Sequence, residues 1–190
     1  IMNRWPRGFF ALLGAQFFSS WADNALLIVA IAQLIATDQP AWTAPLLKCL
    51  FTLAYVVLAP WVGCSADGWS KTRVMWVAHA LKLMGVMGLW LGWDILLSYA
   101  WVGVGAALYS PAKYGWITEV EPPHRLVHAN AWIEVSTVGA AILGVTLGGV
   151  MLGSWLTQTQ MHLWAMAYLS TDSTYVTALL VMAVLYVCPI

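Results

Sequence analysis

The stretch FFALLGAQFFSSWADNALLIVAIAQLIA, residues 9–36, decides the fold class of this chain. Its one charged residue is Asp23, and the other positions are apolar, small or uncharged polar. An α-helix needs roughly 20 residues to cross the hydrocarbon core of a bilayer, so this run is long enough to span it. The stretch therefore predicts a transmembrane helix that carries one ionisable side chain inside the membrane.

Similar apolar runs follow along the rest of the chain. Inside a bilayer the backbone must satisfy its own hydrogen bonds, and these runs lack the short alternating pattern of a barrel strand. We expect an all-α membrane protein whose residues 1–190 form one bundle of six transmembrane helices, at about 9–36, 44–64, 74–92, 95–117, 126–152 and 173–188. The segment 155–171 fits either an interfacial helix or an extended start of the last helix.

The composition excludes several classes of function. Charged residues make up 8% of the chain and apolar residues 62%, whereas a soluble domain has roughly 25% charged residues. The net charge is zero and the basic residues are scattered, which argues against binding to nucleic acid. The three cysteines show no CxxC spacing and have no histidine beside them, so we expect no metal and no cofactor. We also expect that the chain is not an enzyme.

Basic residues near short loops mark the cytoplasmic side of a membrane protein. They precede the first helix, lie between the second and third helices, and lie between the fourth and fifth, at Arg4, Arg7, Lys71, Arg73 and Arg125. The loops on the opposite side hold no basic residue. Both termini are therefore predicted to be cytoplasmic.

The loop between the second and third helices carries the clearest local motif. A glycine is followed four residues later by an aspartate and then by two basic residues: Gly63, Asp67, Lys71 and Arg73. This pattern resembles the conformational loop motif of the major facilitator superfamily, although Gly68 and Ser70 depart from it. The resemblance implies that the chain is the N-terminal six-helix half of a secondary transporter, with a C-terminal six-helix half absent from this sequence and acting as its partner.

Longer strings resemble one branch of that superfamily, the bacterial lysophospholipid transporters. They are AQFFSSWADNALL (15–27), YVVLAPWVGCSAD (55–67), RVMWVAHALKLMG (73–85), WVGVGAALYSPAKYG (101–115) and HANAWIEVST (128–137). The resemblance implies inward movement of lysophospholipids, chiefly lysophosphatidylethanolamine, across the bacterial inner membrane by alternating access. It also implies a functional link to an acyltransferase or acyl-carrier-protein synthetase.

Five polar residues lie within membrane depth and are the candidate substrate-binding residues. A charge in hydrocarbon costs a few kcal/mol, so each is expected to face a cavity or a partner. On the transporter interpretation, Asp23 and Asn24 line a water-accessible path and hold an ammonium group or exchange a proton or cation. The alternative is that they form a buried polar pair with a structural role. Lys113 contacts a headgroup phosphate or forms an ion pair with Glu134, and the two alternatives carry equal weight. For Lys82, pairing within the bundle or snorkelling is favoured over substrate contact.

Two other functions stay open. One is a proton-coupled exporter of small amphipathic compounds, against which stand Ala100 and Val145 at positions where such exporters carry an arginine and a proline. The other is a membrane anchor or assembly module without transport.

The small-residue series Ala140, Gly144 and Gly148 predicts a face where another helix approaches closely.

Overall fold

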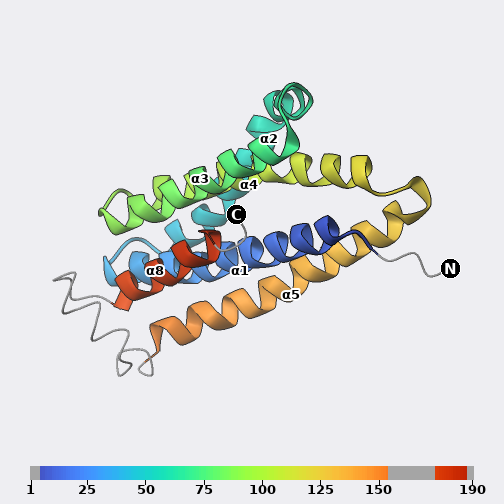
Figure 1. Ribbon diagram of the computed structural model, residues 1–190. Helices are drawn as coiled ribbons and strands as arrows, with labels where there is room; N and C mark the ends of the chain where they lie inside the picture. The colour runs from blue at the N-terminus through green and yellow to red at the C-terminus, as the bar shows by residue number, and fades with distance from the viewer. Residues whose placement is uncertain (1–4, 154–173, 188–190) are drawn as a thin grey trace.

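The computed structural model describes residues 5–153 and 174–187, and the regular secondary structure of this part of the chain is entirely helical (Figure 1). Its long helices are α1 (Arg7–Ala36), α2 (Thr43–Gly68), α3 (Lys71–Trp90), α4 (Ile95–Val120), α5 (Leu126–Leu152) and α8 (Thr174–Val187), and a short 3-10 helix, η1 (Pro123–Arg125), precedes α5. These helices begin and end within about four residues of the ranges read from the apolar runs. The segment 155–171 lies outside the described residues.

Four of the described helical segments are long and apolar enough to cross a membrane. They are Arg7–Ala36, Thr43–Val62, Ile95–Val120 and Pro123–Leu152. The helix α3 carries charged residues at its start and a lysine in its interior, and the described part of α8 is only 14 residues long. The chain is therefore a multi-pass membrane protein, whereas the full set of six spans stays a prediction.

The helices associate in two groups. The helix α1 packs along α5, and α4 packs along both α3 and α2 (Figure 1). The direct contact between α1 and α4 is much smaller, and α8 bridges the groups by packing on α1 and on α3. A side chain at the junction of α1, α3 and α8 can therefore link both groups, and Asp23, Lys82 and Tyr186 meet at this junction.

Close approach between helices depends on glycine at several positions. A Cβ atom added to Gly144 on α5 would lie 2.6 Å from the backbone oxygen of Trp21 on α1. A Cβ atom added to Gly105 on α4 would lie 2.5 Å from the backbone oxygen of Ala78 on α3. The packing face predicted from the small residues of the fifth helix is confirmed, because Gly144 and Gly148 both contact α1.

The turn from α3 to α4 shows how local chemistry sets the helix ends. Gly92 has a φ of 77°, a left-handed conformation that glycine adopts without steric cost. Asp94 then caps α4, since its Oδ1 accepts a hydrogen bond of 2.9 Å from the backbone N–H of Leu97. This tight turn keeps α3 and α4 antiparallel and in contact along their length.

Candidate functional site

A buried ion pair joins α1 to α3. The Nζ atom of Lys82 lies 2.6 Å from Oδ2 of Asp23 and also donates a hydrogen bond of 2.7 Å to Oγ of Ser19. The hydroxyl of Tyr186 on α8 donates to the other carboxylate oxygen, Oδ1 of Asp23, at 2.5 Å. Both oxygens of the carboxylate are thus engaged by side chains of the same bundle.

This geometry differs from the water-accessible path expected for Asp23. The side chains of Asp23 and Lys82 are 13% and 2% exposed, respectively. Separating a buried pair would leave an uncompensated charge in a medium of low dielectric constant, so the pair favours a fixed arrangement of the helices. The pairing of Lys82 within the bundle, which the sequence favoured, is what the structure shows.

Asn24 points away from this ion pair. Its Nδ2 atom donates a hydrogen bond of 2.8 Å to the backbone oxygen of Ser20, one turn earlier on α1. Its Cβ faces α5, because a Cβ atom added to Gly144 would lie 2.8 Å from it. Asn24 therefore belongs to the contact between α1 and α5 in this structure.

A second polar contact links α1 to α5 one to two turns earlier. The side-chain amide of Gln16 donates to Oγ of Ser20 at 2.8 Å and to Oγ1 of Thr137 at 2.9 Å. Both amide protons are satisfied within the bundle, as burial of an amide requires.

Lys113 presents a different environment. The residue is 4% exposed, and within the described parts of the chain it makes no ion pair closer than 4.0 Å. Its Nζ atom lies 4.5 Å from the ring centroid of Tyr114, a cation–π distance. The alternative of a direct Lys113 to Glu134 ion pair is therefore not realised in this structure.

Glu134 is held by Tyr114 instead. The Tyr114 hydroxyl donates a hydrogen bond of 2.5 Å to Oε1 of Glu134, joining α4 to α5. Glu134 is exposed and Tyr114 is 37% exposed, so the carboxylate lies at the surface of the bundle. The Lys113 ammonium and the Glu134 carboxylate thus both contact Tyr114, and only the carboxylate lies at the surface.

The loop motif is only partly visible. The Nζ atom of Lys71 lies 3.0 Å from Oε1 of Glu119, which ties the start of α3 to the end of α4. Arg73 lines a shallow surface pocket with Trp69, Trp76 and Val77. The backbone of Gly63 and Asp67 belongs to the last turns of α2, and the Asp67 side chain lies outside the described part of the chain.

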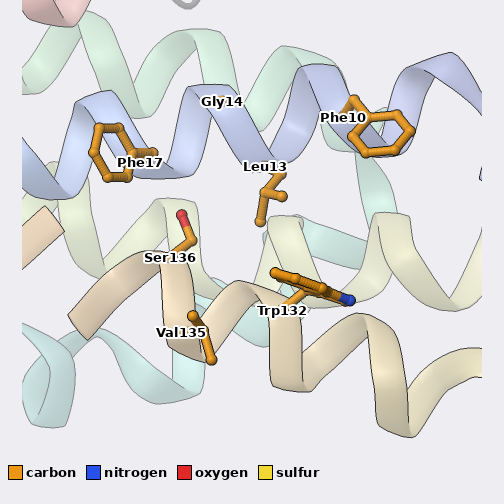
Figure 2. Close-up of a pocket in the computed structure, with 7 residues that line it drawn as sticks. All are labelled: Phe10, Leu13, Gly14, Phe17, Trp132, Val135 and Ser136. Atoms are coloured by element: carbon orange, nitrogen blue, oxygen red, sulfur yellow. The ribbon is translucent and has the colours of Figure 1, made fainter. Parts of the chain in front are cut away.

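Two hollows lie between paired helices. One is a groove of about 400 Å³ between α1 and α5, where apolar side chains surround the hydroxyl of Ser136 (Figure 2). The other is a cavity of about 250 Å³ between α2 and α4, lined by Tyr55, Ala59, Val62, Ala107, Ser110 and Pro111. No group of three or more metal-ligating side chains occurs in the described ranges.

Sequence reasoning did not single out the tyrosines of these sites. Tyr186 binds the Asp23 carboxylate, Tyr114 binds Glu134, and Tyr55 lines the cavity between α2 and α4. A tyrosine in an apolar helix is consistent with simple packing, and its hydroxyl needs a polar partner only when buried. The one signal in the sequence that could have identified them is that each tyrosine lies within a predicted membrane helix, where its hydroxyl needs a polar partner.

Comparison with known proteins agrees with the sequence resemblance. Curated relatives named "Lysophospholipid transporter LplT" match from Photorhabdus laumondii (50% identity over 149 residues, 78% of this chain and 37% of the relative) and Yersinia enterocolitica (45% over 162 residues, 85% and 40%). A relative of the same name from Salmonella paratyphi B is 44% identical over 164 residues, 86% of this chain and 41% of the relative.

The chain is a homologue of LplT. It spans about two fifths of the length of the curated relatives that it matches. These LplT relatives are named as transporters and not as enzymes. No protein-family model matches the chain, and no solved structure matches it.

Proposed function

We propose that this chain is the N-terminal six-helix half of a major facilitator superfamily transporter that moves lysophospholipids, chiefly lysophosphatidylethanolamine, inward across the bacterial inner membrane. Support comes from its homology to LplT, from its apolar helices and from the loop motif. The missing partner is a C-terminal six-helix bundle, and transport proceeds by alternating access between the two halves with both termini cytoplasmic. An acyltransferase or acyl-carrier-protein synthetase consumes the delivered lipid.

The observation that carries this proposal is the separation of Lys113 from Glu134. Phosphoethanolamine is a zwitterion, with an anionic phosphate next to a cationic ammonium group. Lys113 makes no ion pair within 4.0 Å among the described residues, and Glu134 is exposed and accepts a hydrogen bond from Tyr114. The phosphate binds Lys113 as a compact charge, and the ammonium binds Glu134.

Asp23, Asn24 and Lys82 take a supporting role in this proposal. Substrate can reach the Asp23 carboxylate only by displacing Lys82 or Tyr186 from it. These residues hold α1 against α3, α8 and α5, and they act on the substrate through the positions of those helices. The acyl chain stays in contact with lipid or apolar side chains, which requires few amide partners.

The test measures uptake of radiolabelled lysophosphatidylethanolamine into membrane vesicles that hold the full-length protein encoded by the gene of this chain. Lys113→Gln is expected to lower uptake at least tenfold, because the phosphate loses its cation. Lys48→Gln is the matched control: Lys48 is an exposed lysine near the start of α2 whose Nζ lies 5.1 Å from the Phe51 ring, and its loss leaves uptake unchanged. Equal uptake by Lys113→Gln and the unaltered protein would contradict the proposed site. The absence of any lysophospholipid uptake would contradict the proposed function.

A second candidate is a proton-coupled exporter of small amphipathic compounds. The observation that favours it is the largely buried Asp23 carboxylate, because an acid inside the membrane is a site for proton exchange. Efflux that follows an imposed proton gradient, together with indifference to lysophospholipids, would support this candidate over the first.

A further inference from the structure

The cavity between α2 and α4 is apolar apart from two hydroxyl groups. Tyr55 comes from α2 and Ser110 from α4, and both of these hydroxyl-bearing side chains line the cavity. The other lining side chains are those of alanine, valine and proline, and none of the lining residues is charged. Tyr55 is 36% exposed, so the cavity can be reached from the surface of the bundle.

A third polar group comes from the backbone of α4. Pro111 lies inside the helix and has no N–H, so the carbonyl of Ala107, four residues earlier, loses its helical donor. Ala107 lines the same cavity as Pro111. An unmatched carbonyl in an apolar setting is costly, and a ligand that donates a hydrogen bond relieves this cost.

These three groups select the chemistry of a ligand. Each hydroxyl can both donate and accept, and the carbonyl can accept only. A neutral hydroxyl fits the set because it donates to the carbonyl and accepts from tyrosine or serine. The cavity of about 250 Å³ is smaller than the roughly 300–1,000 Å³ of pockets that hold a drug-sized molecule, so it fits a small unit such as glycerol.

The position of the cavity relative to Lys113 supplies the link to a lipid. Lys113 follows Ser110 by three residues on α4, which is about 4.5 Å along the helix axis. In a lysophospholipid whose acyl chain is on the terminal glycerol carbon, the free hydroxyl lies on the middle carbon, next to the one that carries the phosphate ester. A phosphate bound at Lys113 therefore brings this hydroxyl to about the level of Ser110.

We propose that Tyr55, Ser110 and the Ala107 carbonyl form the subsite that recognises the free glycerol hydroxyl of a lysophospholipid. This inference rests on the proposed function and adds the reason for its selectivity. A diacyl phospholipid carries an ester and a second chain at that carbon, so it cannot donate to the carbonyl and does not fit the cavity. Sites that hydrogen-bond a substrate hydroxyl discriminate strongly against analogues that lack it.

The experiment compares two substrates in vesicles that hold the full-length protein. One is lysophosphatidylethanolamine, and the other is its deoxy analogue, in which hydrogen replaces the free glycerol hydroxyl. The unaltered protein is expected to take up the natural substrate at least tenfold faster. Ser110→Ala and Tyr55→Phe each remove one hydroxyl and are expected to narrow this ratio to below about threefold.

Two further variants sharpen the comparison. Pro111→Ala restores a backbone N–H that can engage the Ala107 carbonyl, so it is expected to narrow the ratio in the same direction. Ser136→Ala is the matched control, because Ser136 is a serine in the other groove, between α1 and α5, and its loss leaves the ratio unchanged (Figure 2). The amount of each variant in the membrane is measured alongside uptake.

Three outcomes would overturn the inference. Equal uptake of both substrates by the unaltered protein would overturn it while leaving the proposed function intact. Absence of uptake of either substrate would overturn both. An equal reduction in the uptake of both substrates by Ser110→Ala and Tyr55→Phe, with an unchanged ratio, would show that these hydroxyls support the fold and do not select the substrate.

Discussion

Lys82 on α3 and Lys113 on α4 lie in apolar helices and are almost equally buried, at 2% and 4% exposure. Lys82 has an aspartate 2.6 Å away and a serine hydroxyl 2.7 Å away. Lys113 has the face of an aromatic ring, and among the described residues no carboxylate lies within 4.0 Å of it. The difference shows that burial alone does not distinguish a binding residue from a structural one. The distinguishing feature is whether the buried charge already has an oppositely charged partner.

The physical reason lies in desolvation. Removing an ammonium group from water costs several kcal/mol, and a carboxylate at hydrogen-bond distance offsets much of that cost. An aromatic face offsets roughly 0.5 to 2 kcal/mol of this desolvation cost, so most of the cost of burying the Lys113 ammonium is not compensated by Tyr114. A phosphate group could pair with the Lys113 ammonium without breaking an ion pair between two side chains.

The largest expected effect comes from unpairing Lys82. Asp23→Leu leaves the Lys82 ammonium buried without its carboxylate, and the free energy of unfolding should fall by about 3–5 kcal/mol. Thermal or denaturant unfolding of the purified full-length protein measures this change. The double variant Asp23→Leu with Lys82→Met removes both charges and should be more stable than Asp23→Leu alone. A single variant as stable as the unaltered protein would show that the pair does not hold the bundle together.

A smaller change of opposite sign is expected at Lys113. Lys113→Met removes a buried charge that lacks a carboxylate partner, so the free energy of unfolding should stay the same or rise by about 1 kcal/mol. The same unfolding measurement, set beside Lys82→Met as the matched lysine variant, checks this prediction. A loss of several kcal/mol at Lys113 would mean that the two lysines play the same structural role.

The smallest effect is expected at a third lysine near the end of the bundle. Lys71 pairs with Glu119 at 3.0 Å, but the two side chains are 18% and 58% exposed. Ion pairs in contact with water contribute roughly 0.2–1 kcal/mol, so Glu119→Gln should lower the free energy of unfolding by about 0.5 kcal/mol. Raising the salt concentration should shrink this difference and leave the effect of Asp23→Leu almost unchanged. A salt-independent loss of several kcal/mol would contradict the assignment.

The helices were predictable because each rests on a continuous local signal. Uninterrupted apolar runs exclude water, and a backbone without water closes its own hydrogen bonds as a helix. The same logic marked Asp23, Lys82, Lys113 and Glu134 as exceptions that need a partner. The contact of Gly144 with α1 followed from small residues at every fourth position.

The partners themselves were not predictable from local patterns. Lys82 and Asp23 are 59 positions apart, and Tyr186 and Asp23 are 163 positions apart, so their contacts depend on how α1, α3 and α8 dock. The sequence left Glu134 with Lys113 as one of two equal alternatives, and the hydrogen bond to Tyr114 arises from the crossing of α4 and α5.

Hydropathy and charge alone were enough to establish a helical membrane protein with a few costly polar groups at membrane depth. Those properties belong to single residues and their near neighbours, and lipid imposes the same requirement on every segment. Which lysine has a carboxylate partner, which contacts an aromatic ring instead, and which residues line a cavity beside Pro111 all depend on packing between distant helices. Ion pairs and hydrogen bonds act over a few ångströms, so which side chains pair is determined only when the helices pack together.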